Sequence, residues 1–140
     1  RSAIEIVREY AAYEYGPEAA DDVVRAVRLM EEGHGHQIDY AALGTSGRPA
    51  VYRLRHTEHA DECLSLLQRA ARRMTPAARR RWRWRILLLR ATLDAQLRRS
   101  GGRPTAVTER CFEELTRLYS ARKAEGSVAP PTAARLGIKA

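Results

Sequence analysis

The chain has 140 residues, of which 44% are apolar and 30% are charged. This composition is typical of a soluble globular protein and excludes the disordered, collagen-like and membrane-embedded classes. The length suits a single domain that buries a core without disulfides or metals. The longest uncharged apolar run, Ile86–Leu89, is far too short to span a membrane.

The N-terminal stretch carries several charges, which argues against a signal peptide there. The chain begins at Arg1 rather than Met, which is compatible with a segment of a longer protein. Neither observation indicates a cellular compartment.

The chain is basic, with 25 Lys and Arg residues against 17 Asp and Glu residues, a net charge of +8. All the basic residues except Lys123 and Lys139 are arginines. A surplus of this size favours a nucleic-acid partner, because contacts to phosphates supply most non-specific affinity. Arginine is equally suited to ion pairs inside a protein, so its position decides between the two interpretations.

The start and stop signals of the first half predict two helices followed by an irregular region. Ser2 and Glu5 fit a capping box that opens the first helix, which Gly16 ends. The second helix runs from Pro17 to Gly33. Residues 33–56 have the composition of a long loop, in which Val51–Leu54 is either extended or a helical turn and lacks a good pairing partner.

Three further helices are predicted in the second half. Thr57 caps the third, Thr75 and Pro76 open a fourth that runs from about 76 to 99, and Thr105 opens the fifth. Residues 1–126 then form a helical domain, and residues 127–140 form a tail without regular structure. The predicted fold is an all-α, five-helix bundle.

The fourth helix is apolar on two opposite sides, which is typical of a helix at the centre of a bundle. One face holds Trp82, Ile86, Leu89, Leu93 and Leu97, and the other holds Trp84, Leu87, Leu88, Ala91 and Ala95. We therefore expect this helix to be central.

The basic run from Arg79 to Arg85 is the segment most like a nucleic-acid site. Because the helix around it is apolar on two sides, most of these arginines are expected to flank buried contacts and to pair with acids of neighbouring helices. The only credible nucleic-acid patch is the exposed corner formed by Arg72, Arg73, Arg79, Arg80 and Arg81.

Histidines and cysteines give two weaker candidates. His56 and His59 flank the start of the third helix beside acidic residues, but their spacing matches no standard metal motif, so solvated loop histidines are the simpler interpretation. Cys63 and Cys111 lie on apolar helix faces, which favours buried, reduced thiols, with a disulfide as the alternative. We expect no metal and no cofactor.

No catalytic constellation is predicted in this chain. Its acidic pairs, such as Glu31 and Glu32, are adjacent along a helix, so the two side chains point in different directions and cannot flank one bond. No serine has a nucleophile-elbow setting and no glycine-rich phosphate loop follows a strand.

Several helical segments resemble a known kind of region, namely the helical C-terminal region that follows the catalytic barrel in large bacterial glycoside hydrolases of the α-glucuronidase-like and hexosaminidase-like types. The segments that carry the resemblance are Glu5–Ala11, Tyr15–Ala20, Leu29–Glu31, Trp82–Ala91 with Asp94, Phe112–Tyr119 and Pro130–Pro131. The resemblance implies an all-helical module that packs beside a sugar-cleaving barrel. It carries over no catalytic residue, because the acid and the nucleophile of those enzymes lie on the barrel.

We therefore expect a non-catalytic accessory domain of a carbohydrate-active enzyme, whose partner is a protein or an upstream domain rather than a membrane. Its contact surface is expected on the first helix, at Tyr10, Tyr13 and Tyr15. The alternative is a basic helical regulator that binds nucleic acid through the corner from Arg72 to Arg81.

Overall fold

The computed structural model describes residues 2–32, 36–38, 52–54 and 57–124. These residues form mostly helices, which confirms the predicted all-α class, together with one short two-stranded ribbon. The elements in chain order are α1 (Ala3–Tyr15), α2 (Ala20–Glu32), β1 (His36–Ile38), β2 (Tyr52–Leu54), α3 (Ala60–Arg72), α4 (Pro76–Arg79), α5 (Trp82–Arg99) and α6 (Ala106–Ala124).

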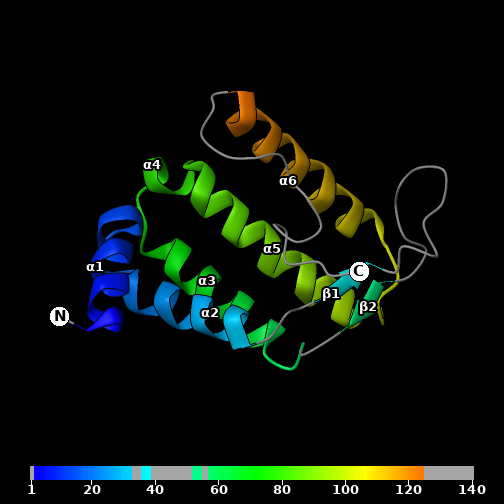
Figure 1. Ribbon diagram of the computed structural model, residues 1–140, viewed down its shortest axis with the longest axis horizontal. Helices are drawn as coiled ribbons and strands as arrows, with labels where there is room; N and C mark the ends of the chain where they lie inside the picture. Colours follow the sequence, from blue (N-terminus) through cyan, green and yellow to red (C-terminus); the bar gives the residue numbers. More distant parts are fainter. Residues whose placement is uncertain (1, 33–35, 39–51, 55–56, 125–140) are drawn as a thin grey trace.

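Helix α5 is central, as its sequence predicts. It runs across the molecule with α6 along one side and α3 on the other, and α2 packs on the outside of α3 (Figure 1). Helix α1 contacts α2 and the short α4 at one end of the molecule. The fold thus consists of a group of helices, α1 to α3, and the single helix α6, joined through α5.

The two apolar faces of α5 belong to two separate core clusters. Trp84, Ala91 and Ala95 enter the first cluster, which is shared with α1, α2 and α3. Ile86, Leu93 and Leu97 enter the second cluster, which is shared with α6. The predicted division of α5 into two buried faces is therefore confirmed.

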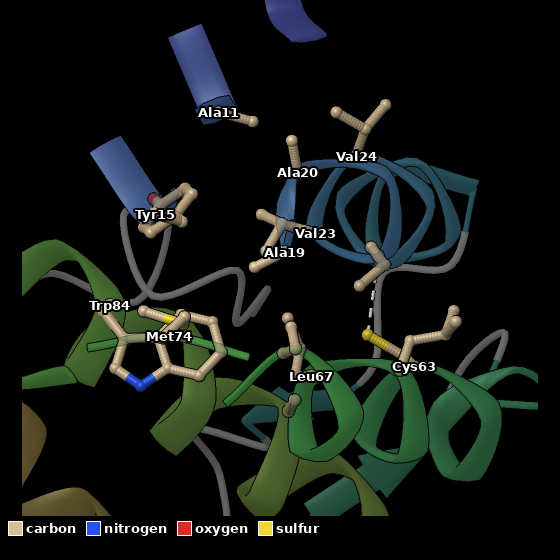
Figure 2. Close-up of a cluster of buried hydrophobic side chains, with 14 of the residues drawn as sticks. Ala11, Tyr15, Ala19, Ala20, Val23, Val24, Cys63, Leu67, Met74 and Trp84 are labelled. Carbon is tan, nitrogen blue, oxygen red and sulfur yellow. Dashed lines mark hydrogen bonds between the residues drawn. The ribbon is translucent and has the colours of Figure 1, made fainter. Parts of the chain in front are cut away.

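In the first cluster α2 contributes small side chains, whereas α3 contributes three leucines together with Cys63 and Ala70. The Tyr15 ring tilts onto the Trp84 indole, with 5.8 Å between the ring centres, and Leu67 of α3 is fully buried (Figure 2). In the same cluster the Cys63 thiol donates a hydrogen bond of 3.4 Å to the carbonyl of Ala26 on α2. Small residues let these helices approach closely.

The second cluster depends on the larger side chains of α6, among them Phe112, Leu115 and Leu118. Thr105 and Thr108 fix the start of this helix, because each side-chain hydroxyl accepts from the backbone N–H of the other residue. Thr105 therefore opens the helix, as predicted.

The single helix predicted over 76–99 is wrong, because the structure breaks it into α4 and α5 and so has six helices among the described residues. Arg81 has an extended backbone, with φ −66° and ψ 143°. No glycine or proline marks this break. Tertiary contacts explain it, since Arg79 reaches back to the end of α3 and Arg81 reaches across to α1.

Two predicted helix starts are also corrected. Helix α2 begins at Ala20 rather than Pro17, after a turn in which the N–H of Ala19 donates to the carbonyl of Gly16. Gly16 has a φ of 98°, which glycine adopts without strain. Helix α3 begins at Ala60, with His59 rather than Thr57 at the N-cap position. The backbone carbonyl of Thr57 accepts a hydrogen bond from the N–H of Ala60.

The predicted long loop contains the ribbon. His36–Ile38 pairs antiparallel with Tyr52–Leu54, so the expectation that Val51–Leu54 lacks a partner is wrong. Three residues are too few to show strand periodicity, which is why the partner strand gave no signal. The predicted tail, residues 127–140, lies outside the described residues.

Candidate functional site

The arginine corner predicted as a nucleic-acid patch is partly occupied by contacts within the chain. Arg79 donates hydrogen bonds of 2.8 and 2.7 Å to the carbonyls of Ala71 and Met74, and so caps the end of α3. Arg72 and Arg80 are exposed, and their guanidinium groups make no hydrogen bond or ion pair with another described residue. Within the corner, Arg72 and Arg80 are therefore the arginines whose guanidinium groups are available to an external partner.

The other two arginines of the corner approach buried carboxylates. Arg81 Nη1 donates a hydrogen bond of 3.1 Å to the Glu14 carbonyl and lies 4.0 Å from the Glu14 carboxylate. Arg73 Nη1 lies 3.9 Å from the carboxylate of Asp22. The corner thus serves packing as well as the surface, as expected for arginines that flank buried contacts.

Asp22 on α2 makes a bidentate ion pair with Arg69 on α3. Its side chain is 9% exposed and accepts two hydrogen bonds from Arg69, of 2.8 and 2.6 Å. This bidentate pair lowers the pKa of the Asp22 carboxyl below its usual range, with Arg73 adding to the effect. Asp22 therefore ties α2 to α3 as a carboxylate.

Glu14 near the end of α1 is the second buried carboxylate. Arg83 of α5 lies 3.9 Å from its Oε1 atom, whereas Arg81 approaches the Oε2 atom. The Arg83 guanidinium also lies over the Trp82 ring, 4.7 Å from its centre. Sequence reasoning missed both buried acids, because Glu14 and Asp22 resemble ordinary acids on solvated helix faces.

The pairing follows from an uneven distribution of charge along the chain. Residues 1–68 contain 12 acidic and 7 basic residues, whereas residues 69–140 contain 5 acidic and 18 basic residues. Ion pairs join the two parts, for example Arg69 with Asp22 and Arg99 with Asp61. Within the basic run, Arg81, Arg83 and Arg85 approach the acids Glu14 and Glu114 of neighbouring helices, as expected, whereas Arg79 binds backbone carbonyls.

Apolar exposure is concentrated on α1. All the large hydrophobic residues that are exposed in the described part of the chain lie on this helix, namely Ile4, Ile6, Val7, Tyr10 and Tyr13. Tyr13 is the most exposed, at 83%. Two of the three tyrosines predicted to form a contact surface are thus on the outside.

Tyr15 is the exception, and its place in a contact surface was wrongly predicted. It is 8% exposed and packs on Trp84 in the first cluster. Burial, together with the nearby Tyr10 and Glu14, raises the pKa of its phenol to about 12. Tyr15 falls two residues after Tyr13, which turns it to the inner side of the helix.

Of the histidine and cysteine candidates, His59, Cys63 and Cys111 are among the described residues. His56 lies outside the described residues, and His59 occupies the N-cap position of α3 without a side-chain capping bond. No group of three or more metal-ligating side chains occurs in the ranges that the structure describes. Cys63 and Cys111 are both buried and free, and burial raises the pKa of the Cys63 thiol to about 11.

A shallow pocket of about 350 Å³ lies beside the arginine corner. Tyr13 and the Gly16–Glu18 turn line one side, and Arg73 and Arg81 contribute from the segments around α4. It is the place where the exposed aromatic end of α1 meets the corner.

Comparison of the chain with protein-family models, curated proteins and solved structures gave no match. Among the described residues, no helix is long and apolar enough to cross a bilayer.

Proposed function

We propose that this chain is a non-catalytic helical accessory domain, which packs through the outer face of α1 against the catalytic barrel of a carbohydrate-active enzyme. The observation that supports docking is the concentration of exposed apolar residues on α1. The glycoside hydrolase as partner follows from the resemblance of the helical segments.

Three of the five exposed apolar residues form a stripe, whereas Ile4 and Val7 line a groove between α1 and α2. Ile6, Tyr10 and Tyr13 are spaced four and three residues apart, so their side chains line one side of the helix. Contiguous apolar patches on a protein surface mark contact sites far more often than isolated residues do. Burying one such side chain contributes about 1.5–3 kcal/mol.

The other side of α1 is held in place, so the stripe is presented on a fixed support. Ala11 and Tyr15 are buried in the first cluster, and Arg81 holds the carbonyl of Glu14. A docking surface on an anchored helix loses little conformational entropy when its partner binds.

A photo-crosslinking experiment tests this function. A photoreactive phenylalanine derivative replaces Tyr13 in the protein as its host produces it, and the crosslinked peptides are identified by mass spectrometry. We expect crosslinks to the barrel of a sugar-cleaving enzyme, in the same polypeptide or in a partner. The same probe at the exposed position Thr116 on α6 is the matched control. Crosslinks to an unrelated enzyme, or equal yields at both positions, would overturn the proposal.

The second candidate is a basic regulator that binds nucleic acid through the corner. Its support is the charge surplus of residues 69–140 and the uncommitted guanidinium groups of Arg72 and Arg80. Affinity for duplex DNA should then fall steeply with salt, with a logarithmic slope of about −0.9 for each neutralised phosphate. Replacing both arginines by glutamine should make that slope shallower by the amount expected for the loss of two phosphate contacts. Absence of binding at about 50 mM salt would reject this candidate.

A further inference from the structure

The pocket beside the arginine corner carries two cationic groups that the chain itself satisfies only in part. Arg73 and Arg81 line it together with Tyr13 and two acids, the buried Glu14 and the exposed Glu18. Its volume of about 350 Å³ is within the range of small-molecule sites.

Arg73 lies close to Asp22 but makes no hydrogen bond to it. The Asp22 carboxylate already accepts two short hydrogen bonds from Arg69. The Nη1 atom of Arg73 lies 3.9 Å from the same carboxylate, which is beyond hydrogen-bond distance. The N–H groups of the Arg73 side chain therefore have no acceptor among the described residues.

Glu14 is likewise approached by more than one guanidinium group. Two guanidinium groups, of Arg81 and Arg83, lie 4.0 and 3.9 Å from its two oxygen atoms. Arg81 uses one donor on the backbone carbonyl of Glu14, and a guanidinium has five donors. Four arginines thus surround two buried carboxylates, and two of the four line the pocket.

We propose that this pocket binds a small organic phosphate monoester. A phosphate group offers several oxygen atoms that two guanidinium groups can hold together by charge-assisted hydrogen bonds. Tyr13 lies beside them with most of its ring exposed, and so offers an aromatic surface to the organic part of the ligand. The exposed Glu18 also lines the pocket, and its charge disfavours a ligand with a second anionic group.

Titration of the whole chain with phenyl phosphate, inorganic phosphate and phenol, followed by NMR and calorimetry, tests the site. We expect phenyl phosphate to bind most tightly, inorganic phosphate more weakly, and phenol least. Arg73→Gln should weaken phenyl phosphate binding by about tenfold, because it removes charge-assisted hydrogen bonds. Arg81→Gln should do the same, and its thermal unfolding shows whether α1 stays in place.

Arg72→Gln and Arg80→Gln are the matched controls, because these arginines are exposed nearby but do not line the pocket. They should leave affinity within about twofold, which is the scale of a screened surface charge. Tyr13→Ser should weaken phenyl phosphate more than inorganic phosphate. Equal losses in the controls would show general electrostatic attraction and overturn the site, as would an absence of saturable binding in the unaltered chain. The pocket shares Tyr13 with the proposed docking face of α1, but the titrations do not require docking, so a failure of the docking proposal leaves them interpretable.

Discussion

Helices α1 and α6 lie at two edges of the fold, but they differ in the kind of side chain that they expose to solvent. Helix α6 buries Phe112, Leu115 and Leu118 against α5, and its exposed positions include Glu113 and Thr116. Helix α1 buries Ala11 and Tyr15 and exposes isoleucine, valine and tyrosine. The α6 pattern is that of an ordinary outer helix, whereas the apolar exposure of α1 is the observation on which the proposed docking rests.

The two helices also differ in how they are attached. Large apolar side chains attach α6, whereas α1 relies on a few buried residues and on polar contacts. The Ser2 capping box closes its first turn, and Arg8 pairs with Asp21 of α2 at 3.0 Å. Near its end, Glu14 is held by the two arginines from the start of α5. Substitutions on each side of α5 can therefore separate the two kinds of attachment.

The largest expected effect is that of Trp84→Ala in the first cluster. Trp84 is 1% exposed and packs on Tyr15 of α1, so the substitution leaves a large cavity and removes a contact that holds α1. We expect a loss of about 3–5 kcal/mol in the free energy of unfolding, measured by urea denaturation.

Trp82→Ala is the matched control for that loss, because Trp82 is the same residue type two positions away and is only partly buried. Trp82→Ala should lower the free energy of unfolding clearly less than Trp84→Ala does. Equal costs for the two tryptophans would contradict the division of α5 into a fully buried and a partly buried aromatic position.

A somewhat smaller effect is expected on the other side of α5. Leu115 is fully buried, and Leu115→Ala should cost about 2–5 kcal/mol. Because the second cluster is separate from the first, amide hydrogen exchange should speed up more in α6 than in α2 and α3. Thr116→Ala, on the exposed side of the same turn, should change stability by less than about 0.5 kcal/mol. Uniform acceleration along the whole chain would show that the two clusters unfold as one.

The tie between α2 and α3 gives an effect of intermediate size with a defined pH dependence. Asp22→Asn should cost about 1–3 kcal/mol at neutral pH, because it removes charged hydrogen bonds from Arg69. The folded chain lowers the pKa of Asp22, so the carboxylate stabilises the fold above the pKa of the unfolded state. That stabilisation disappears as the pH falls through the lower pKa of the folded state.

Urea denaturation of both proteins between neutral and acidic pH measures this difference. The gap in unfolding free energy should be constant near neutrality and should close in strong acid. Asp21→Asn is the control, because both side chains of the Arg8–Asp21 pair are exposed. Such a pair contributes about 0–1 kcal/mol to the free energy of unfolding. A gap that persists unchanged in acid would contradict the role of the Asp22 charge.

Features with a regular period were predictable from the sequence. The two faces of α5 follow from the spacing of its apolar residues, and Thr105 follows from a standard capping pattern. The first turn of α1 likewise matches the Ser2 and Glu5 capping box. These features depend on residues that are close together along one helix, so the sequence alone contains the relevant information.

Features that depend on contacts between distant residues were not predictable. The break at Arg81 has no glycine or proline, and the contact made there is distant, because the Arg81 side chain donates to the carbonyl of Glu14 on α1. Glu14 and Asp22 resemble surface acids until α5 and α3 bring arginines to them. The candidate pocket consists of such contacts, and for this reason no motif in the sequence indicated it.

The smallest expected effect on stability is that of Tyr13→Ala, and it tests the contrast between α1 and α6 most directly. Tyr13 is 83% exposed, so its loss should change the free energy of unfolding by less than about 0.5 kcal/mol. Tyr15→Ala on the inner side of the same helix should cost about 3–5 kcal/mol in the same urea experiment. If Tyr13→Ala is neutral, the ring does nothing for the fold of this chain, as a residue reserved for an external partner requires. If it destabilises as much as Tyr15→Ala, the outer face of α1 belongs to the core, and its assignment as a docking surface is wrong.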